Sequence, residues 1–265
     1  MVCCVSSGFP LPFLMHFLFR SRDDGGSRVV EPVPTVFPTI EGADVAAVFV
    51  GKRIAGDFYD SIRVSPQRVL IGLLDVAGRR EDNRQILVAA QNMFRKFGPE
   101  LFADPDVNEA EAMTELSLRI NRGLIDMAGV LSCPAFMACY HEKFGTLCYT
   151  NDGHTPALLR DSTGVSELTS TGLPLGLFSH ATSVSQIVGL ERGAALVVVS
   201  NGVVTCEGNG SGSVFGLDGV KETLQGSPPE RAQALCSAIL SSAGNFSRHA
   251  PVCDDRTALA LIRTK

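Results

Sequence analysis

The fold class is decided by residues 56–75, which read GDFYDSIRVSPQRVLIGLLD. Two runs within it, 58–64 and 69–75, are rich in aliphatic and aromatic side chains and are separated by the turn-forming sequence Ser-Pro-Gln. Two strands joined by so short a turn must pair antiparallel. The stretch therefore predicts a β-hairpin that places Asp57 near its start and Asp75 at its end.

Apolar runs separated by turn residues recur outward from this hairpin toward both ends of the chain. Further strands are predicted at residues 45–50, 135–141, 146–151, 157–160, 165–168, 182–190, 194–200 and 257–263. The turn sequences at 142–145, 161–164 and 191–193 join neighbours in this set and indicate additional hairpins.

Three helices are predicted, at residues 82–97, 108–127 and 230–242, from apolar residues that recur at helical spacing. We expect Gly98-Pro99 to end the first helix and Asn108 to cap the second. Because hairpins dominate and the helices are segregated from them, the pattern predicts an α+β fold and not a parallel βαβ sheet.

Composition excludes several classes of protein. Of the 265 residues, 45% are hydrophobic and 19% are charged, so the chain has enough apolar surface for a core and is not disordered over most of its length. The net charge of −5 and the lack of a basic stripe argue against a nucleic-acid partner. The 8 cysteines include no CxxC pair, so we expect buried free thiols in a reducing, cytoplasmic compartment.

Residues 1–43 are interpreted as an apolar tail and a Pro-rich linker before a domain at 44–265. The mostly apolar stretch 1–19 contains two prolines, and its positive charges follow the apolar run, which fits neither a spanning helix nor a secretory signal. We expect this tail to contact a membrane or a partner protein, and a true membrane anchor is the alternative. Residues 20–43, with three prolines, predict a linker.

Acidic residues collect at the predicted strand ends. Asp57 opens one strand, Asp75 closes the next, and Asp254 stands just before the last. Carboxylates that converge at strand ends form an oxygen-ligand site for a hard divalent cation. The alternative is that aspartate simply favours turns. The neighbouring Asp60 and Asp255 are expected either to be structural or to support the candidate ligands without binding the ion themselves.

Six stretches, taken together and in order, carry a resemblance to a known family. They are Ala55-Gly56-Asp57-Phe58-Tyr59-Asp60, Leu74-Asp75-Val76-Ala77-Gly78, Asn151-Asp152-Gly153-His154-Thr155-Pro156, Leu173-Pro174-Leu175-Gly176, Ser200-Asn201-Gly202-Val203 and Asp254-Asp255-Arg256-Thr257. Over residues 44–263 the chain resembles the stage II sporulation protein E type of phosphatase domain, within the metal-dependent type 2C (PPM-type) serine/threonine phosphatases.

The resemblance implies a four-layer α/β/β/α sandwich of two antiparallel sheets flanked by helices, with two manganese or magnesium ions at one edge. It implies hydrolysis of phosphoserine or phosphothreonine on a bacterial signalling protein by metal-activated water. Carried over by position, Asp57, Asp75 and Asp254 are implied to be catalytic and metal-binding. The carbonyl of Val76 and the side chain of Asn201 are implied to be further ligands.

The chain departs from the family pattern in three of these motifs. Asn201 stands where the family usually has aspartate, Arg79 and Arg80 stand where Gly-His-Gly is usual, and Ala55 replaces a glycine. An amide oxygen can ligate a hard cation but supplies no charge. The alternative function is therefore a degenerate phosphatase fold that acts by binding a partner. Arg79 and Arg80 are candidates for holding the substrate phosphate, or they form a solvated helix start.

Overall fold

The computed structural model describes residues 31–51, 56–76, 80–128, 132–208, 212–226, 231–248 and 254–265. The strands are β1 (Ala43–Val50), β2 (Gly56–Ser65), β3 (Arg68–Val76), β4 (Ala135–His141), β5 (Thr146–Asp152), β6 (Ala157–Asp161), β7 (Gly164–Leu168), β8 (Gln186–Gly189), β9 (Ala195–Val199) and β10 (Arg256–Arg263). The helices are α1 (Arg80–Phe102), α2 (Glu109–Ala128), α3 (Asn201–Val204), α4 (Gly216–Gly226) and α5 (Ala232–Phe246).

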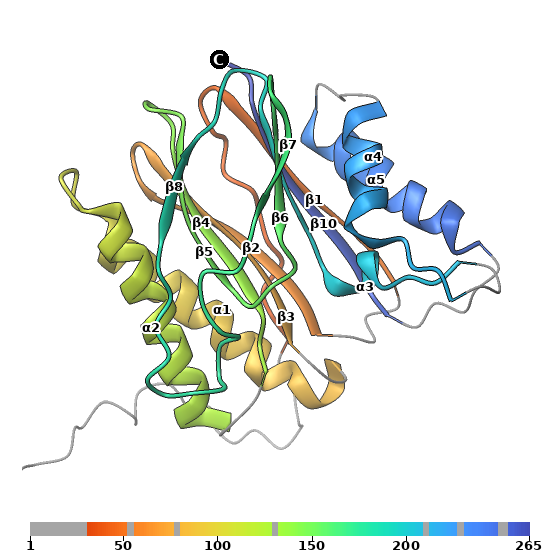
Figure 1. Cartoon of the computed structure of the whole chain (residues 1–265). Helices are drawn as coiled ribbons and strands as arrows, with labels where there is room; N and C mark the ends of the chain where they lie inside the picture. Colours follow the sequence, from red (N-terminus) through yellow and green to blue (C-terminus); the bar gives the residue numbers. More distant parts are fainter. Residues whose placement is uncertain are drawn as a thin grey trace, which may run out of the picture.

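The strands form two five-stranded sheets that pack face to face. Sheet A has the order β1-β10-β9-β6-β7, and sheet B has the order β2-β3-β4-β5-β8. Neighbouring strands pair antiparallel in both sheets. Helices α1 and α2 cover the outer face of sheet B, and α4 and α5 cover the outer face of sheet A (Figure 1). The predicted α+β class and four-layer sandwich are confirmed.

Strand β3 is apolar on both faces because each face is covered. Val69, Ile71 and Leu73 point into the core between the sheets, whereas Leu70 and Leu74 point into the core under α1 and α2. Successive side chains of a strand alternate between faces. The same alternation places Asp75 on the side of β3 that faces sheet A.

The local predictions are largely confirmed. The hairpins β2–β3, β4–β5 and β6–β7 form as expected. Asn108 caps α2, since its Oδ1 accepts hydrogen bonds from the backbone N–H groups of Ala110 at 3.2 Å and Glu111 at 3.4 Å. The structure adds the short helix α3 and the helix α4, which the sequence did not predict.

The expectation that Gly98-Pro99 ends the first helix is wrong, because α1 continues to Phe102. Packing against sheet B explains the continuation. A Cβ at Gly98 would lie 2.7 Å from Leu70 Cδ1, so glycine lets the helix approach β3 closely. Beyond the proline, Phe102 is fully buried in the core under the helices. Tertiary burial here outweighs the local preference for a helix stop.

The predicted strand at residues 182–190 is shorter than expected, and its connection to the next strand is not a hairpin. Only Gln186–Gly189 forms β8, which pairs with β5 in sheet B. The following strand, β9, pairs with β10 and β6 in sheet A. The turn at 191–193 therefore passes from one sheet to the other.

Residues 31–38, called here the N-terminal strap, lie against β2 and α1. Gln91 of α1 makes two hydrogen bonds to the backbone of Val33: its Oε1 accepts from the N–H at 2.7 Å, and its Nε2 donates to the carbonyl at 2.8 Å. Thr35 Oγ1 donates to the carbonyl of Tyr59 at 2.8 Å. Ile40, just after the strap, is buried between the sheets. Part of the segment interpreted as a linker thus packs on the domain.

The cysteines that the structure describes agree with the expectation of free thiols. Five are buried and unpaired, namely Cys133, Cys139, Cys148, Cys206 and Cys236. Cys3, Cys4, Cys253 and the apolar stretch 1–19 lie outside the described residues. Among the helices in the described part of the chain, none is long and apolar enough to cross a bilayer.

Candidate active site

The β2–β3 hairpin sets two carboxylates against each other. Asp57 is the direct cross-strand partner of Asp75. Directly opposed residues of an antiparallel pair point to the same face with Cβ atoms about 4.5–5.5 Å apart, and like charges in this arrangement repel. The shared face is the one turned toward sheet A. The two acidic side chains are opposed because the register of the hairpin shifts by one residue between Arg63 and Ser65, beyond its short turn.

Asp57 is buried, with 7% of its surface exposed. Thr257 Oγ1, on β10 of the opposite sheet, donates a hydrogen bond to Asp57 Oδ2 at 2.7 Å. Burial, followed by the charges of Asp75 and Asp254, raises the pKa of Asp57 to about 7, although hydrogen bonds from Ser200 and Thr257 oppose the rise. A cation that binds near this carboxyl would favour its ionised form and so promote release of the proton to solvent.

Asp75 and Asp254 complete the acidic edge. The backbone N–H of Asn201 donates to Asp75 Oδ2 at 3.0 Å, and burial raises the pKa of Asp75. Burial is also the main cause of the raised pKa of Asp254, to which the charges of Asp75 and Asp255 add. The side chain of Asn201 is exposed. At position 201, therefore, it is the backbone that contacts the acidic pair.

Two glycines allow the segments of the edge to approach each other. A Cβ at Gly202 would lie 2.1 Å from the carbonyl oxygen of Asp255, which brings the start of α3 against the segment carrying Asp254. A Cβ at Gly56 would lie 2.2 Å from the carbonyl oxygen of Val76. A side chain at either position would push apart the strand ends that bear the acids.

The remaining predicted site residues are Val76, Arg79 and Arg80, which in the sequence run from the last residue of β3 to the first residue of α1. The carbonyl of Val76, at the end of β3, accepts a long hydrogen bond of 3.5 Å from Asn83 Nδ2. Arg80 is the first residue of α1, but its side chain lies outside the described residues, as does the whole of Arg79. The proposed contact of these arginines with a substrate phosphate stays a prediction.

The donor chemistry of the edge suits a hard divalent cation, although the described side chains do not enclose one. Among the residues that the structure places, no three His, Cys, Asp or Glu side chains lie close enough together to surround an ion. Asp57, which is buried, and Asp75, which is half-buried, nevertheless face each other, and burial is the main cause of the raised pKa of each. A bound cation relieves such repulsion and favours both charged forms. The pair therefore fits an oxygen-coordinated metal.

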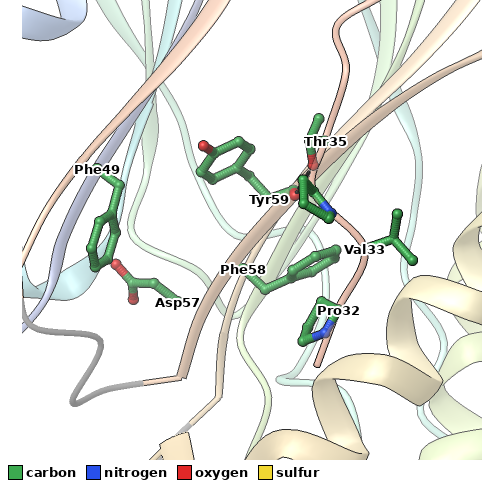
Figure 2. A pocket seen from close by; sticks show the side chains of 8 residues that line it. Pro32, Val33, Thr35, Phe49, Asp57, Phe58 and Tyr59 are labelled. Carbon is green, nitrogen blue, oxygen red and sulfur yellow. Dashed lines mark hydrogen bonds between the residues drawn. The ribbon is translucent and has the colours of Figure 1, made fainter. Parts of the chain in front are cut away.

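A small cavity lies between Asp57 and the N-terminal strap. It has a volume of about 100 Å³ and is lined by residues 32–35, Phe49 and residues 57–59. Figure 2 shows Phe49 and Asp57 on one side of it and Pro32 and Val33 on the other. Small-molecule sites usually measure about 300–1,000 Å³, so this space is too small for one. The strap thus borders the acidic edge.

Ser200 and Thr257 are residues of the candidate site that the sequence analysis missed. Both occur inside stretches quoted for the family resemblance, but nothing in the sequence showed that their hydroxyl groups point at Asp57. Asp60, by contrast, was expected to be structural or to support the candidate ligands. Its buried carboxylate is paired with Arg95 of α1 through contacts of 2.7 and 3.0 Å.

Comparison with known proteins identifies the family of this chain. The model of Stage II sporulation protein E (SpoIIE) matches residues 65–264. The chain belongs to the SpoIIE family. A curated relative, protein IcfG of Synechocystis sp., is 23% identical over 217 residues, which is 72% of this chain and 33% of IcfG. The chain thus spans about a third of the length of that relative.

Solved structures of SpoIIE-type and PP2C domains share the fold. The SiaA-PP2C domain of Pseudomonas aeruginosa aligns with a TM-score of 0.68 at 17% identity, covering 82% of this chain and 84% of that one. The PP2C phosphatase domain of SpoIIE from Bacillus subtilis, with a fragment of its regulatory domain, gives 0.67 at 13%, covering 83% and 61%. The RsbU and RsbW domains of a Mycobacterium tuberculosis protein give 0.66 at 21%, covering 86% and 63%.

Proposed function

We propose that this SpoIIE-family chain is a metal-dependent protein serine/threonine phosphatase that acts on a phosphorylated regulatory protein of bacterial signalling. The observation that carries the proposal is the opposition of Asp57 and Asp75 across the β2–β3 hairpin, in a buried setting, with Asp254 nearby. Membership of the SpoIIE family and the PP2C fold support the same activity. The domain at 44–265 and a cytoplasmic location belong to the proposal.

The residues of the acidic edge would hold two manganese or magnesium ions. Asp57, Asp75 and Asp254 would contribute carboxylate oxygens, and the Val76 carbonyl and Asn201 side chain would be neutral donors. When bound, such ions lower the pKa of water and neutralise phosphoryl oxygens. The chain's own contribution is to hold these oxygens in place: the Asn201 N–H orients Asp75, and the Thr257 hydroxyl orients Asp57.

One observation favours a second function, that of a phosphatase-fold module that binds a partner without catalysis. Position 201 supplies no charge, and its side chain is exposed. An ion at that end of the edge would therefore be held by fewer negative ligands than the family pattern provides. Weak binding of the second ion is the specific expectation of this alternative.

The test is metal-dependent hydrolysis of phosphoserine and phosphothreonine peptides, together with calorimetric titration of manganese. Asp75→Asn removes the carboxylate with almost no change in size. We expect hydrolysis to fall by more than about 100-fold, because changes outside the first ligand shell alone cost 10–100-fold. Asp218→Asn, the same change at a side chain 92% exposed on α4, is the matched control and should leave activity unchanged.

Two outcomes contradict the proposal. Equal hydrolysis by wild type and Asp75→Asn would show that the acidic edge is not the active site. A wild-type protein that neither binds manganese nor hydrolyses either peptide would favour the partner-binding module.

A further inference from the structure

The carboxylate of Asp57 is held by two hydroxyl groups from the opposite sheet. Thr257 of β10 is completely buried and donates from Oγ1 to Asp57 Oδ2 at 2.7 Å. The hydroxyl of Ser200, directly after β9 and also completely buried, lowers the pKa of the same carboxylate. Asp57 itself belongs to β2 of sheet B, so both contacts cross from sheet A.

Ser200 and Thr257 are also locked to each other. The Thr257 N–H donates to Ser200 Oγ at 3.0 Å, and the Ser200 N–H donates to the Thr257 carbonyl at 3.0 Å. Because Ser200 Oγ accepts from Thr257, its single O–H proton remains to be donated to Asp57. Ser200 and Thr257 thus hold each other in place, and the Thr257 hydroxyl is fixed on Asp57.

The position of this pair in the chain gives it a role at the acidic edge. Ser200 directly precedes Asn201, whose N–H holds Asp75. Thr257 follows Asp254 by three residues at the start of β10. The two hydroxyl groups therefore connect Asp57 to the segments of sheet A that carry the other candidate ligands. A shift of one sheet relative to the other would otherwise move Asp57 away from Asp254.

We propose that Ser200 and Thr257 are positioning residues that fix the Asp57 carboxylate in the geometry needed to ligate a divalent cation. They act through Asp57 and not by touching substrate. Residues that orient a ligating carboxylate by hydrogen bonding tune metal affinity in this way. The inference rests on the proposed function, since it takes Asp57 to be a metal ligand.

The experiment compares Thr257→Val, Thr257→Ser and Ser200→Ala in the full chain, with manganese affinity measured by calorimetry and melting temperature measured without metal. Valine keeps the shape of threonine and removes its hydroxyl, whereas serine keeps the hydroxyl. We expect Thr257→Val and Ser200→Ala to weaken manganese binding by about 10–100-fold and Thr257→Ser to retain most of the wild-type affinity. Thr150→Val, the same change at a completely buried threonine of β5, is the control and should leave the affinity unchanged.

The outcomes separate this inference from the proposed function. If wild type binds manganese and both Thr257→Val and Ser200→Ala bind it equally well while melting at a lower temperature, the two hydroxyl groups are only structural and the inference is overturned. If wild type binds no manganese, the metal-dependent function fails and the inference fails with it. Should Thr257→Val not fold, Ser200→Ala and Thr257→Ser still decide the question.

Discussion

Asp57 and Asp60 lie three residues apart on β2, are both buried, and meet opposite surroundings. Asp57 points toward sheet A and faces a second acid, Asp75. Asp60 points toward α1, where the guanidinium of Arg95 pairs with both of its oxygens and the Thr35 hydroxyl of the N-terminal strap donates to Oδ1 at 3.0 Å. An odd step along a strand reverses the face, which is why these two neighbours are separated by the sheet.

The difference teaches how to recognise a functional carboxylate. The buried carboxylate of Asp60 is neutralised by the Arg95 guanidinium, so its burial needs no added ligand. Its hydrogen bonds connect β2 with the strap and with α1. Asp57 directly faces Asp75, so the two carboxylates repel each other and an added cation would stabilise their charged forms. Opposed carboxylates whose pKa values are raised mark candidate binding sites, whereas buried ion pairs mark structural ones.

The largest expected effect concerns Asp152, a third buried aspartate, which accepts a hydrogen bond from Ser117 Oγ at 3.0 Å. Burial raises its pKa to about 7. Because the folded state holds this proton more tightly than the unfolded state, the contribution to stability is full below about pH 4 and is lost as pH rises to about 7. Over this range the free energy of unfolding of the wild type should fall by up to about 4 kcal/mol because of Asp152, and Asp152→Asn should not show this fall.

Urea unfolding of wild type and Asp152→Asn at several pH values between 4 and 8 measures the effect. The difference in unfolding free energy should grow in favour of the variant as pH rises. If the difference in unfolding free energy does not change with pH, burial alone does not raise the pKa of Asp152. The same explanation for the raised pKa of Asp57 would then be weakened.

Next in size is the loss of the buried partner of Arg95. Asp60→Ala leaves the guanidinium without this carboxylate and removes one of the contacts between the strap and β2, that of the Thr35 hydroxyl with Asp60 Oδ1. Removing one partner of a buried pair costs about 3–5 kcal/mol, and since the Arg95 side chain is 32% exposed we expect about 2 kcal/mol. Chemical denaturation measures this cost. The folded fraction of Asp60→Ala should bind manganese almost as tightly as wild type. A loss of manganese affinity as large as that caused by Asp75→Asn would contradict the distinction between Asp57 and Asp60.

A smaller effect is expected when charge is added at the acidic edge. Asn201→Asp places a carboxylate where the family pattern has one, beside the segment that holds Asp75. We expect the second manganese ion to bind about tenfold more tightly, because an added negative charge attracts a cation a few ångströms away. Calorimetry tests this, with Asn245→Asp on the exposed surface of α5 as the control. Unchanged affinity would mean that position 201 does not contribute to the metal site.

The smallest effect is expected at the surface pair that joins the strap to α1. Arg84 Nε and Glu31 Oε1 lie 2.9 Å apart, with 32% and 39% of the two side chains exposed. Such pairs contribute about 0–1 kcal/mol, so Glu31→Gln should shift the melting temperature only slightly. A large shift would indicate that this pair, and not Asp60, fixes the strap.

The sequence by itself determined the elements whose geometry is local. A short turn between two apolar runs forces β2 and β3 to pair antiparallel. The register that sets Asp57 opposite Asp75 also depends on a bulge-type shift between Arg63 and Ser65, which the sequence analysis did not predict. The cap at Asn108 and the tight turns between hairpin strands follow from the same short-range rules.

Only the tertiary structure decided which distant residues surround those acids. Thr257 reaches Asp57 across 200 positions of chain, and Arg95 reaches Asp60 across 35, through the packing of a sheet or helix on β2. The same packing carries α1 through Pro99 and assigns β8 to the sheet opposite β9. Strand periodicity tells which residues share a face, but it does not tell what that face meets. The environment of each aspartate, and hence its role, is therefore a property of the packed sandwich.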